Sequence, residues 1–196
     1  MRLMAEHKYG VRMQGSQTKT EYFEKLGKAA VTLELLQNKP RKNMKITFSH
    51  PSSANKDASF ILYNCARLSA LFRDFNEKVR NKVYPELVPL DNVDFSLLNQ
   101  AEEWELFYVY VVQYPLIVKS CIKDMEKGII NIHYLVSFLC NLCSVFSVYY
   151  RRVRILGAPM AHLIPVLHAR IYLLKSLQVV FHKTLILMNI DPIQNM

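Results

Sequence analysis

Glycine is scarce in this chain, and the loops that hold phosphate through glycine-rich backbone are absent. Only 5 of the 196 residues are glycine, a small number for a sheet protein with many tight turns. The sequence contains neither a G-x-G-x-x-G segment nor a Walker-type G-x-x-x-x-G-K-[ST] segment. These absences exclude the common dinucleotide sites and P-loops, and they favour a helical protein over a sheet-based one.

Cysteine is also infrequent, and the four thiols do not form the pattern of a structural metal site. Cys65, Cys121, Cys140 and Cys143 lie among apolar residues, where a thiol behaves as a small hydrophobic side chain. Cys140-x-x-Cys143 is the one close pair, with Cys121 and His133 as conceivable further ligands, whereas structural zinc sites need two well-spaced pairs. The chain opens without the apolar run of a secretory signal. We therefore expect reduced thiols, a cytoplasmic protein and no bound metal.

No arrangement of residues typical of a catalytic centre occurs in the sequence. The six histidines are dispersed, and neither an H-E-x-x-H nor a G-x-S-x-G segment is present. The adjacent carboxylates of Glu102 and Glu103 are interpreted as the start of a helix, where acidic residues favour the helix dipole. His133 and His168 lie in apolar surroundings and are interpreted as residues of a helical core. The chain is therefore predicted to have no catalytic activity, no cofactor and no small-molecule substrate.

Positive charge is in excess and is concentrated at the two ends of the chain. The net charge is +9, with a segment at 1–58 carrying 11 basic and 5 acidic residues. The segment at 59–118 carries 5 basic and 8 acidic residues, and the segment at 119–196 carries 9 and 3. Such an excess indicates a phosphate backbone or an anionic membrane as partner, bound by a face assembled from both ends. The alternative is that these basic residues simply solvate the surface.

One long segment without formal charge has the length of a membrane span. Residues 128–150 are followed directly by arginines at 151, 152 and 154, as at the end of a spanning helix. However, Asn131, His133 and Asn141 interrupt the apolar run, and the other apolar segments are amphipathic. We interpret this segment as the most buried helix of a bundle, and we expect no membrane contact.

Apolar periodicity and helix-breaking residues divide the chain into a series of helices. Helices are expected at 18–37, 100–114, 132–152 and 165–188, and a further helix is expected to begin at Asp57 or Ser59 and to end at 83. An interruption is expected at Gly27, and a kink or restart is expected at Pro115. The short connections are typical of antiparallel neighbours. The sequence thus predicts an all-α antiparallel bundle at 58–196, preceded by a basic, partly helical segment at 1–57.

Four segments in order along the chain resemble the anticodon-binding domain of arginyl-tRNA synthetases, known as the DALR domain. FILYNCARL at 60–68 is similar to the segment that opens the domain, and LCNLCSVFSVYYRRVRIL at 139–156 is similar to its tyrosine-bearing helix. ARIYLLKSLQVV at 169–180 is similar to its last helix, and LMNI at 187–190 with the terminal methionine is similar to its closing segment. Upstream, residues 26–38 resemble the strip that precedes the domain. The resemblance implies an antiparallel helical bundle of the DALR type.

The motifs of the synthetase catalytic domain have no counterpart in this sequence. No segment matches His-Ile-Gly-His or Lys-Met-Ser-Lys-Ser, so aminoacylation is excluded for this chain. The sequence is most similar to animal members of the family that have no synthetase activity. That resemblance implies an accessory protein that binds arginine tRNA through the anticodon loop and delivers it to a 3-methylcytidine methyltransferase. The alternative is a helical interaction module that docks a partner protein without binding RNA.

The resemblance also assigns residues to anticodon recognition. In the family, the contacts come from the first helix of the domain, the tyrosine-bearing helix and the terminal methionine. These positions correspond to Phe60, Asn64, Tyr150, Arg154 and Met196. Phe60 stands where some relatives have tyrosine, so it can stack on a base without donating a hydroxyl. Arg154 stands where an aromatic residue can occur, and its guanidinium can stack on a base or contact phosphate.

Further basic and aromatic residues extend this predicted RNA-binding surface. Tyr149 precedes Tyr150, and Arg151 and Arg152 follow at the helix end, where they suit phosphate contacts but also favour the helix dipole. A second cluster is predicted to follow the anticodon stem and consists of Lys39, Arg41, Lys42 and Lys45. Arg67 is expected to support the bundle. If about five phosphates are neutralised, the affinity should fall steeply with salt, by a logarithmic slope near −0.7 to −0.9 per contact.

Overall fold

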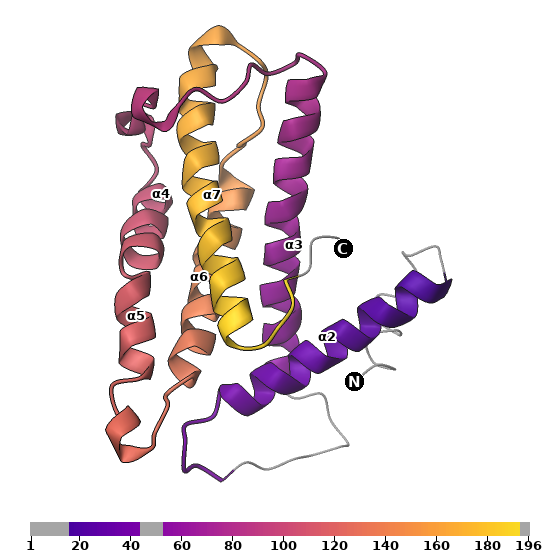
Figure 1. Cartoon of the computed structure of the whole chain (residues 1–196). Coiled ribbons are helices and arrows are strands. Elements are labelled where there is room, and N and C mark those ends of the chain that lie inside the picture. Colours follow the sequence, from indigo (N-terminus) through magenta and orange to yellow (C-terminus); the bar gives the residue numbers. More distant parts are fainter. Residues whose placement is uncertain (1–15, 44–52, 193–196) are drawn as a thin grey trace.

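The computed structural model describes residues 16–43 and 53–192, and this part of the chain is helical without strands (Figure 1). The longer helices are α2 (Ser16–Leu36), α3 (Ser53–Arg80), α4 (Ala101–Glu105), the π-helical η4 (Leu106–Val112), α5 (Tyr114–Cys121), α6 (His133–Arg152) and α7 (Ile164–Leu187). Short 3₁₀ turns η2 (Leu90–Asn92), η3 (Phe95–Leu97), η5 (Met125–Lys127) and η6 (Ala161–Leu163) lie in the connections. The predicted all-α class is confirmed.

The helices form an antiparallel bundle that is crossed at one end by α2 (Figure 1). α3, the α4–η4–α5 rod, α6 and α7 alternate in direction, and α6 contacts α3, α5 and α7. The centre of the bundle is filled by fully buried side chains such as Leu62, Leu106, Leu142, Phe146 and Phe181. The bundle therefore has one continuous apolar core, which also encloses a few hydrogen-bonded polar side chains such as Asn64 and Glu103.

The rod formed by α4, η4 and α5 follows from local sequence signals. A capping box begins α4, since the backbone N–H of Gln100 donates to Oε2 of Glu103 at 3.0 Å. Pro115 has no N–H and leaves the carbonyl of Val111 without its usual partner, so the rod breaks and α5 restarts with this proline in its first turn. The restart expected at Pro115 is confirmed.

Two helix boundaries differ from the expectation. Gly27 does not interrupt α2, because one glycine costs only about 0.5–1 kcal/mol and Leu26 and Leu33 are held in the core. α3 begins at Ser53 rather than near Asp57 or Ser59. No glycine or proline lies between Pro51 and Pro85, so no helix-breaking residue delays its start. The boundary expected between residues 57 and 58 therefore falls inside α3, and the core of the bundle includes residues of α2.

Two stretches have the length and hydropathy of a membrane span, His133–Arg152 and Ala161–Leu187. Both pack within the bundle, with 50% and 44% of their most apolar windows buried. Core helices of soluble proteins share these properties, so length and composition are weak support for a span. α6 buries one face against the core, as expected for the uncharged segment at 128–150, whereas the second stretch was not anticipated.

Candidate nucleic-acid interface

One face of α3 carries Phe60 and the residues three, four and seven positions after it, because such spacings share one side of an α-helix. Asn64 is fully buried on this face, where its Nδ2 donates to the carbonyl of Phe60 at 2.8 Å. The hydroxyl of Ser147 on α6 donates to Oδ1 of Asn64 at 2.8 Å. Asn64 thus fixes α3 against α6 and sets the position of its half-buried neighbour Phe60.

Beside this contact lies a group of stacked aromatic and guanidinium planes, which we call the Tyr63–Arg67–Tyr150 cluster. The guanidinium carbon of Arg67 lies 4.4 Å from the ring centroid of Tyr63 and 4.8 Å from that of Tyr150. Nη2 of Arg67 also donates to the Tyr63 hydroxyl at 2.7 Å. Tyr63 is 46% exposed, and the ring of Tyr150 packs edge-on against Phe146 with centroids 5.8 Å apart. The cluster therefore joins the core to the surface through planes on which bases can stack.

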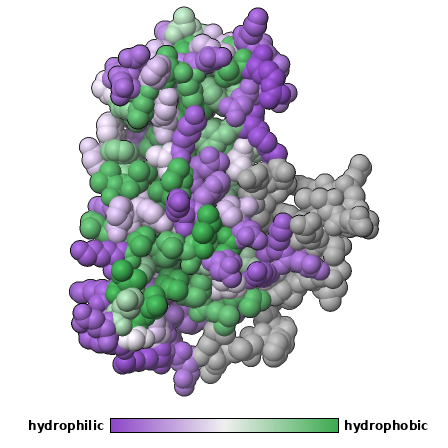
Figure 2. Space-filling view, in the orientation of Figure 1, coloured by the Kyte–Doolittle hydropathy of each residue, from purple (hydrophilic) through white to green (hydrophobic). Residues whose placement is uncertain are grey.

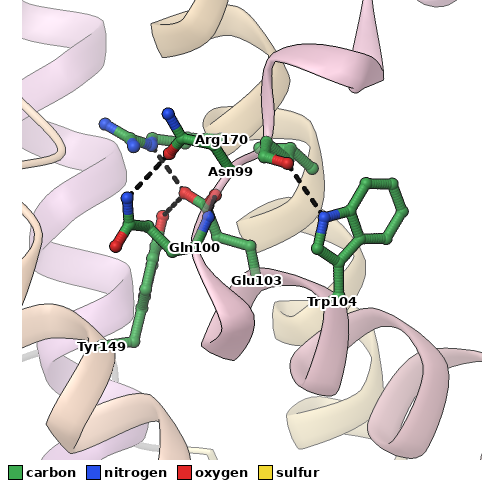
Figure 3. A network of polar contacts seen from close by, with 7 residues as sticks. Asn99, Gln100, Glu103, Trp104, Tyr149 and Arg170 are labelled. Carbon is green, nitrogen blue, oxygen red and sulfur yellow. Dashed lines mark hydrogen bonds and ion pairs between the residues drawn. The ribbon is translucent and has the colours of Figure 1, made fainter.

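The buried carboxylate of Glu103 holds Tyr149, the residue immediately before Tyr150 of this cluster. Oε1 of Glu103 accepts hydrogen bonds from the Tyr149 hydroxyl at 3.0 Å and from Nε of Arg170 at 2.7 Å. Figure 3 shows Tyr149, Arg170 and Gln100 converging on Glu103, with Trp104 on the next position of α4. Burial, and then the charge of Glu103, raise the pKa of Tyr149 well above its usual range. Tyr149 is consequently a neutral hydrogen-bond donor that joins α6 to Glu103 of α4, and Glu103 in turn binds Arg170 of α7.

The arginines at the end of α6 differ in their surroundings. Arg152 forms an ion pair with Glu102, whereas Arg151 and Arg154 are exposed, and neither has a carboxylate partner among the described residues. α6 ends at Arg152 because Val153 adopts an extended backbone, which directs the chain away from the helix axis. Arg151 and Arg154 are therefore exposed cations within four residues of Tyr150 in the sequence.

The second basic cluster lies near the other end of α6. Lys39, Arg41 and Lys42 are exposed in the turn after α2, where Arg41 has a positive φ of 72°. Burial lowers the pKa of His133 at the start of α6, and the charge of Lys39 lowers it further, which places Lys39 nearby. Because α6 has 20 residues, the two basic clusters lie about 25–30 Å apart along the bundle.

The thiols of the Cys140-x-x-Cys143 pair do not resemble metal ligands. Burial raises the pKa of Cys140 to about 11 and raises that of Cys143 well above its usual value. Because burial disfavours the thiolates, these thiols behave as small apolar side chains of α6. No group of three or more potential metal ligands occurs within the described ranges.

Comparison with known proteins gives the family. Residues 61–196 match the DALR anticodon binding domain. The chain belongs to this family. A Rattus norvegicus protein named "DALR anticodon-binding domain-containing protein 3" is 32% identical in an alignment 181 residues long that covers 90% of this chain and 34% of the rat protein. The Danio rerio protein of the same name is 30% identical in an alignment 203 residues long, gaps included, that covers 98% of this chain and 36% of the fish protein.

A solved structure shows the same fold at greater distance. Arginyl-tRNA synthetase from Thermus thermophilus superposes with a TM-score of 0.67 and 19% identity, over 100% of this chain and 30% of the synthetase. The chain spans about a third of the length of the curated relatives it matches. The matched part is the anticodon-binding DALR domain, and the synthetase catalytic domain is absent from these 196 residues.

The structure of this DALR domain separates the predicted site residues into groups. Exposed or half-buried positions are Phe60, Tyr150, Arg151, Arg152, Arg154, Lys39, Arg41 and Lys42, whereas Lys45 and Met196 lie outside the described residues. Asn64 and Tyr149 are fully buried and hydrogen-bonded inside the bundle, so they offer no surface to RNA. We correct the prediction for these two residues: they position the interface rather than belong to it.

Two residues of the candidate interface were missed or assigned another role. Tyr63 was not predicted, although it lies three positions from Phe60 and shares its side of α3. Arg67 was expected to support the bundle, and the structure gives it both that role and a place in the exposed cluster. The spacing of Phe60, Tyr63 and Arg67 along one helix was a usable signal for this surface.

Proposed function

We propose that this DALR domain is a non-catalytic accessory protein of the cytoplasm that binds arginine tRNA through its anticodon loop. It supports 3-methylcytidine formation in that tRNA by a partner methyltransferase, which carries the chemistry. The observation that supports this function most strongly is the Tyr63–Arg67–Tyr150 cluster, followed in the sequence by two exposed arginines, within a domain of the anticodon-binding family.

The chemistry of the cluster suits an RNA loop better than a duplex. Loop bases can be splayed out and stacked on aromatic rings or on a guanidinium plane, and here both kinds of plane lie together. Arg151 and Arg154 would then contact the phosphates on either side of a stacked base. The turn at Lys39, Arg41 and Lys42, about 25–30 Å away, would contact the anticodon stem.

The test is binding of the purified chain to arginine tRNA and to a non-cognate tRNA across a salt series. We expect tighter binding to arginine tRNA and a linear fall of log K with log salt. Replacing both Arg151 and Arg154 with Gln should reduce the slope by about 1.4 to 1.8, which is the loss of two phosphate contacts. Equal binding to both tRNAs, with variants that change only the slope, would refute anticodon recognition.

Variants of the cluster separate base stacking from charge. Arg67→Lys keeps the charge but removes the planar guanidinium, and Tyr63→Leu removes an exposed ring. Each should weaken arginine tRNA binding about 5- to 150-fold, the range for loss of one stacked base, with little change in the salt slope. Arg80→Lys and Tyr108→Leu are matched controls at exposed positions away from the cluster, and they should bind tRNA like the parent chain.

The accessory role is tested by methylation. Adding the chain to a 3-methylcytidine methyltransferase and arginine tRNA should raise the rate of methyl transfer, and Arg67→Lys should remove most of this increase. If the chain binds no tRNA and still increases methylation, the interaction-module alternative is favoured over the RNA-binding one.

A further inference from the structure

A pocket with both polar and apolar walls lies between the η4–α5 part of the rod and the first half of α6. Its volume is about 540 Å³, which is within the range of about 300–1,000 Å³ for small-molecule sites. One wall is a stripe of α6 from Tyr134 to Asn141, and the other is a stripe of the rod from Val109 to Ser120. The connection between α5 and α6 also lines the pocket, and Figure 2 shows hydrophilic residues gathered at that end of the bundle.

The pocket differs in its free polar groups from the apolar groove between the rod and α7, which is lined by residues such as Trp104, Phe107 and Val179. In the apolar groove, the hydroxyls and the indole N–H of the lining residues are bonded inside the protein. In the pocket, the exposed side-chain amides of Gln113 and Asn141 form no hydrogen bond with the described residues. The pocket therefore has a free amide on each of its two walls.

A buried hydroxyl without a partner also belongs to the pocket. Tyr110 lines the pocket although only 6% of its surface is exposed. Its hydroxyl forms no hydrogen bond with any described residue. A buried polar group that lacks a partner is costly, and a ligand in the pocket would supply this one.

The charged groups that line the pocket lie in the connection between α5 and α6. The carboxylate of Asp124 accepts hydrogen bonds from Nδ2 of Asn131 at 3.2 Å and from Nζ of Lys127 at 3.0 Å. Its negative charge is therefore compensated. Lys123 also lines the pocket and forms no ion pair with the described residues, so its ammonium group is available to an anion.

We propose that this pocket binds a single nucleotide. A side-chain amide carries a donor and an acceptor side by side, and this pattern pairs with the edge of a base, as Asn and Gln do with adenine. The ring of Tyr134, which is 44% exposed, offers a surface on which a base can stack, and Lys123 suits the phosphate. Two sources supply this chemistry: a free mononucleotide, and an unpaired nucleotide of a bound tRNA. The second source rests on the proposed function.

Calorimetric titration with adenosine monophosphate (AMP), adenosine and ribose 5-phosphate tests whether base and phosphate are both recognised. AMP should saturate one site per chain and bind at least fivefold more tightly than either fragment. Asn141→Leu should weaken AMP binding about 5- to 150-fold, the range for loss of a two-point base contact. Asn76→Leu is the matched control, at an exposed position of α3 outside the pocket, and it should bind AMP like the parent chain. Equal binding of AMP and ribose 5-phosphate, or equal effects of the two variants, would overturn the proposal.

Two further variants separate recognition from folding. Tyr110→Phe removes only the unpartnered hydroxyl, so it should weaken AMP binding without lowering the free energy of unfolding in urea. Lys123→Gln should weaken AMP binding and leave adenosine binding unchanged, whereas Lys119→Gln, exposed on α5 outside the pocket, should change neither. Unchanged AMP binding in both Tyr110→Phe and Lys123→Gln would also overturn the proposal.

Titration of arginine tRNA into the same variants separates the two sources. A free mononucleotide is the ligand if Asn141→Leu loses AMP binding and keeps the tRNA affinity of the parent chain. A nucleotide of the tRNA is the ligand if Asn141→Leu weakens tRNA binding at least fivefold. If the parent chain binds AMP but no tRNA, the proposed function fails and the pocket proposal stands. If Asn141→Leu changes neither AMP binding nor tRNA binding, the pocket proposal fails.

Discussion

The buried carboxylate of Glu103 supports three helices at once, so its removal should destabilise the bundle strongly. Its two oxygens accept hydrogen bonds from Tyr149, Arg170 and the backbone of Gln100. In Glu103→Ala, the guanidinium of Arg170, whose side chain is only 15% exposed, loses its partner. Breaking a buried ion pair from one side costs about 3–5 kcal/mol, and the lost capping bond adds about 0.5–2 kcal/mol. Because some water reaches Arg170, we expect a loss near the lower end, about 3–4 kcal/mol.

Urea unfolding followed by circular dichroism measures this loss directly. Glu105→Ala is the matched control, since it removes an exposed carboxylate from the same helix and should change the free energy of unfolding by less than about 0.5 kcal/mol. Glu103→Gln keeps the shape and loses the charge, so it should cost about 1.5–3 kcal/mol. Replacing both partners, Glu103→Leu with Arg170→Met, should recover much of the stability, because no unpaired charge remains. A loss below 1 kcal/mol for Glu103→Ala would refute this account of the network.

Three further predictions concern the core. Burial lowers the pKa values of His133, His168 and His182 below that of a free histidine, so the unfolded chain binds protons more readily than the folded one. The free energy of unfolding therefore has its full value above about pH 6.5 and declines as the pH falls below it, by up to about 1.4 kcal/mol per histidine and pH unit. Tm at pH 5.5 should consequently be below Tm at pH 7.5. Phe146→Ala should cost about 3–5 kcal/mol in urea unfolding because it empties a fully buried site. Cys143 should react with a thiol reagent only after unfolding, and rapid reaction in the native state at neutral pH would contradict its burial and raised pKa.

The sequence predicted the later helices well because their signals are local. α6 has apolar periodicity along its length, α7 is a long apolar stretch, and Gly157, Pro159 and Pro165 mark the break between them. The start of α3 was placed too late because several capping residues compete there, and only tertiary packing selects among them. The π-helical turn of η4 had no recognisable pattern, since short π segments arise from the geometry of neighbouring helices.

The interface was predicted less completely, for a physical reason. A helical pattern tells which residues share a face, but it does not tell whether that face looks inward or outward. Asn64 was assigned from the family resemblance and Tyr149 as the neighbour of Tyr150, and neither signal reports burial, so both were placed on the RNA surface although they are buried. The exposed Tyr63 was overlooked. Tyr149 and Arg170 meet Glu103 across 46 and 67 residues of sequence, so no local spacing could have joined them.

The position of Glu103 connects the two surfaces of the molecule. Trp104, which follows Glu103 on α4, lines the apolar groove, and Tyr150, which follows Tyr149 on α6, belongs to the Tyr63–Arg67–Tyr150 cluster. Successive residues of a helix point about 100° apart, so fixing the side chains of Glu103 and Tyr149 inside the bundle also fixes the directions of their exposed neighbours. A single buried hydrogen-bond network thus holds a residue of the apolar groove and a residue of the Tyr63–Arg67–Tyr150 cluster in defined positions. Such an arrangement would suit the proposed accessory role, in which a bound RNA is presented to a partner protein in one orientation.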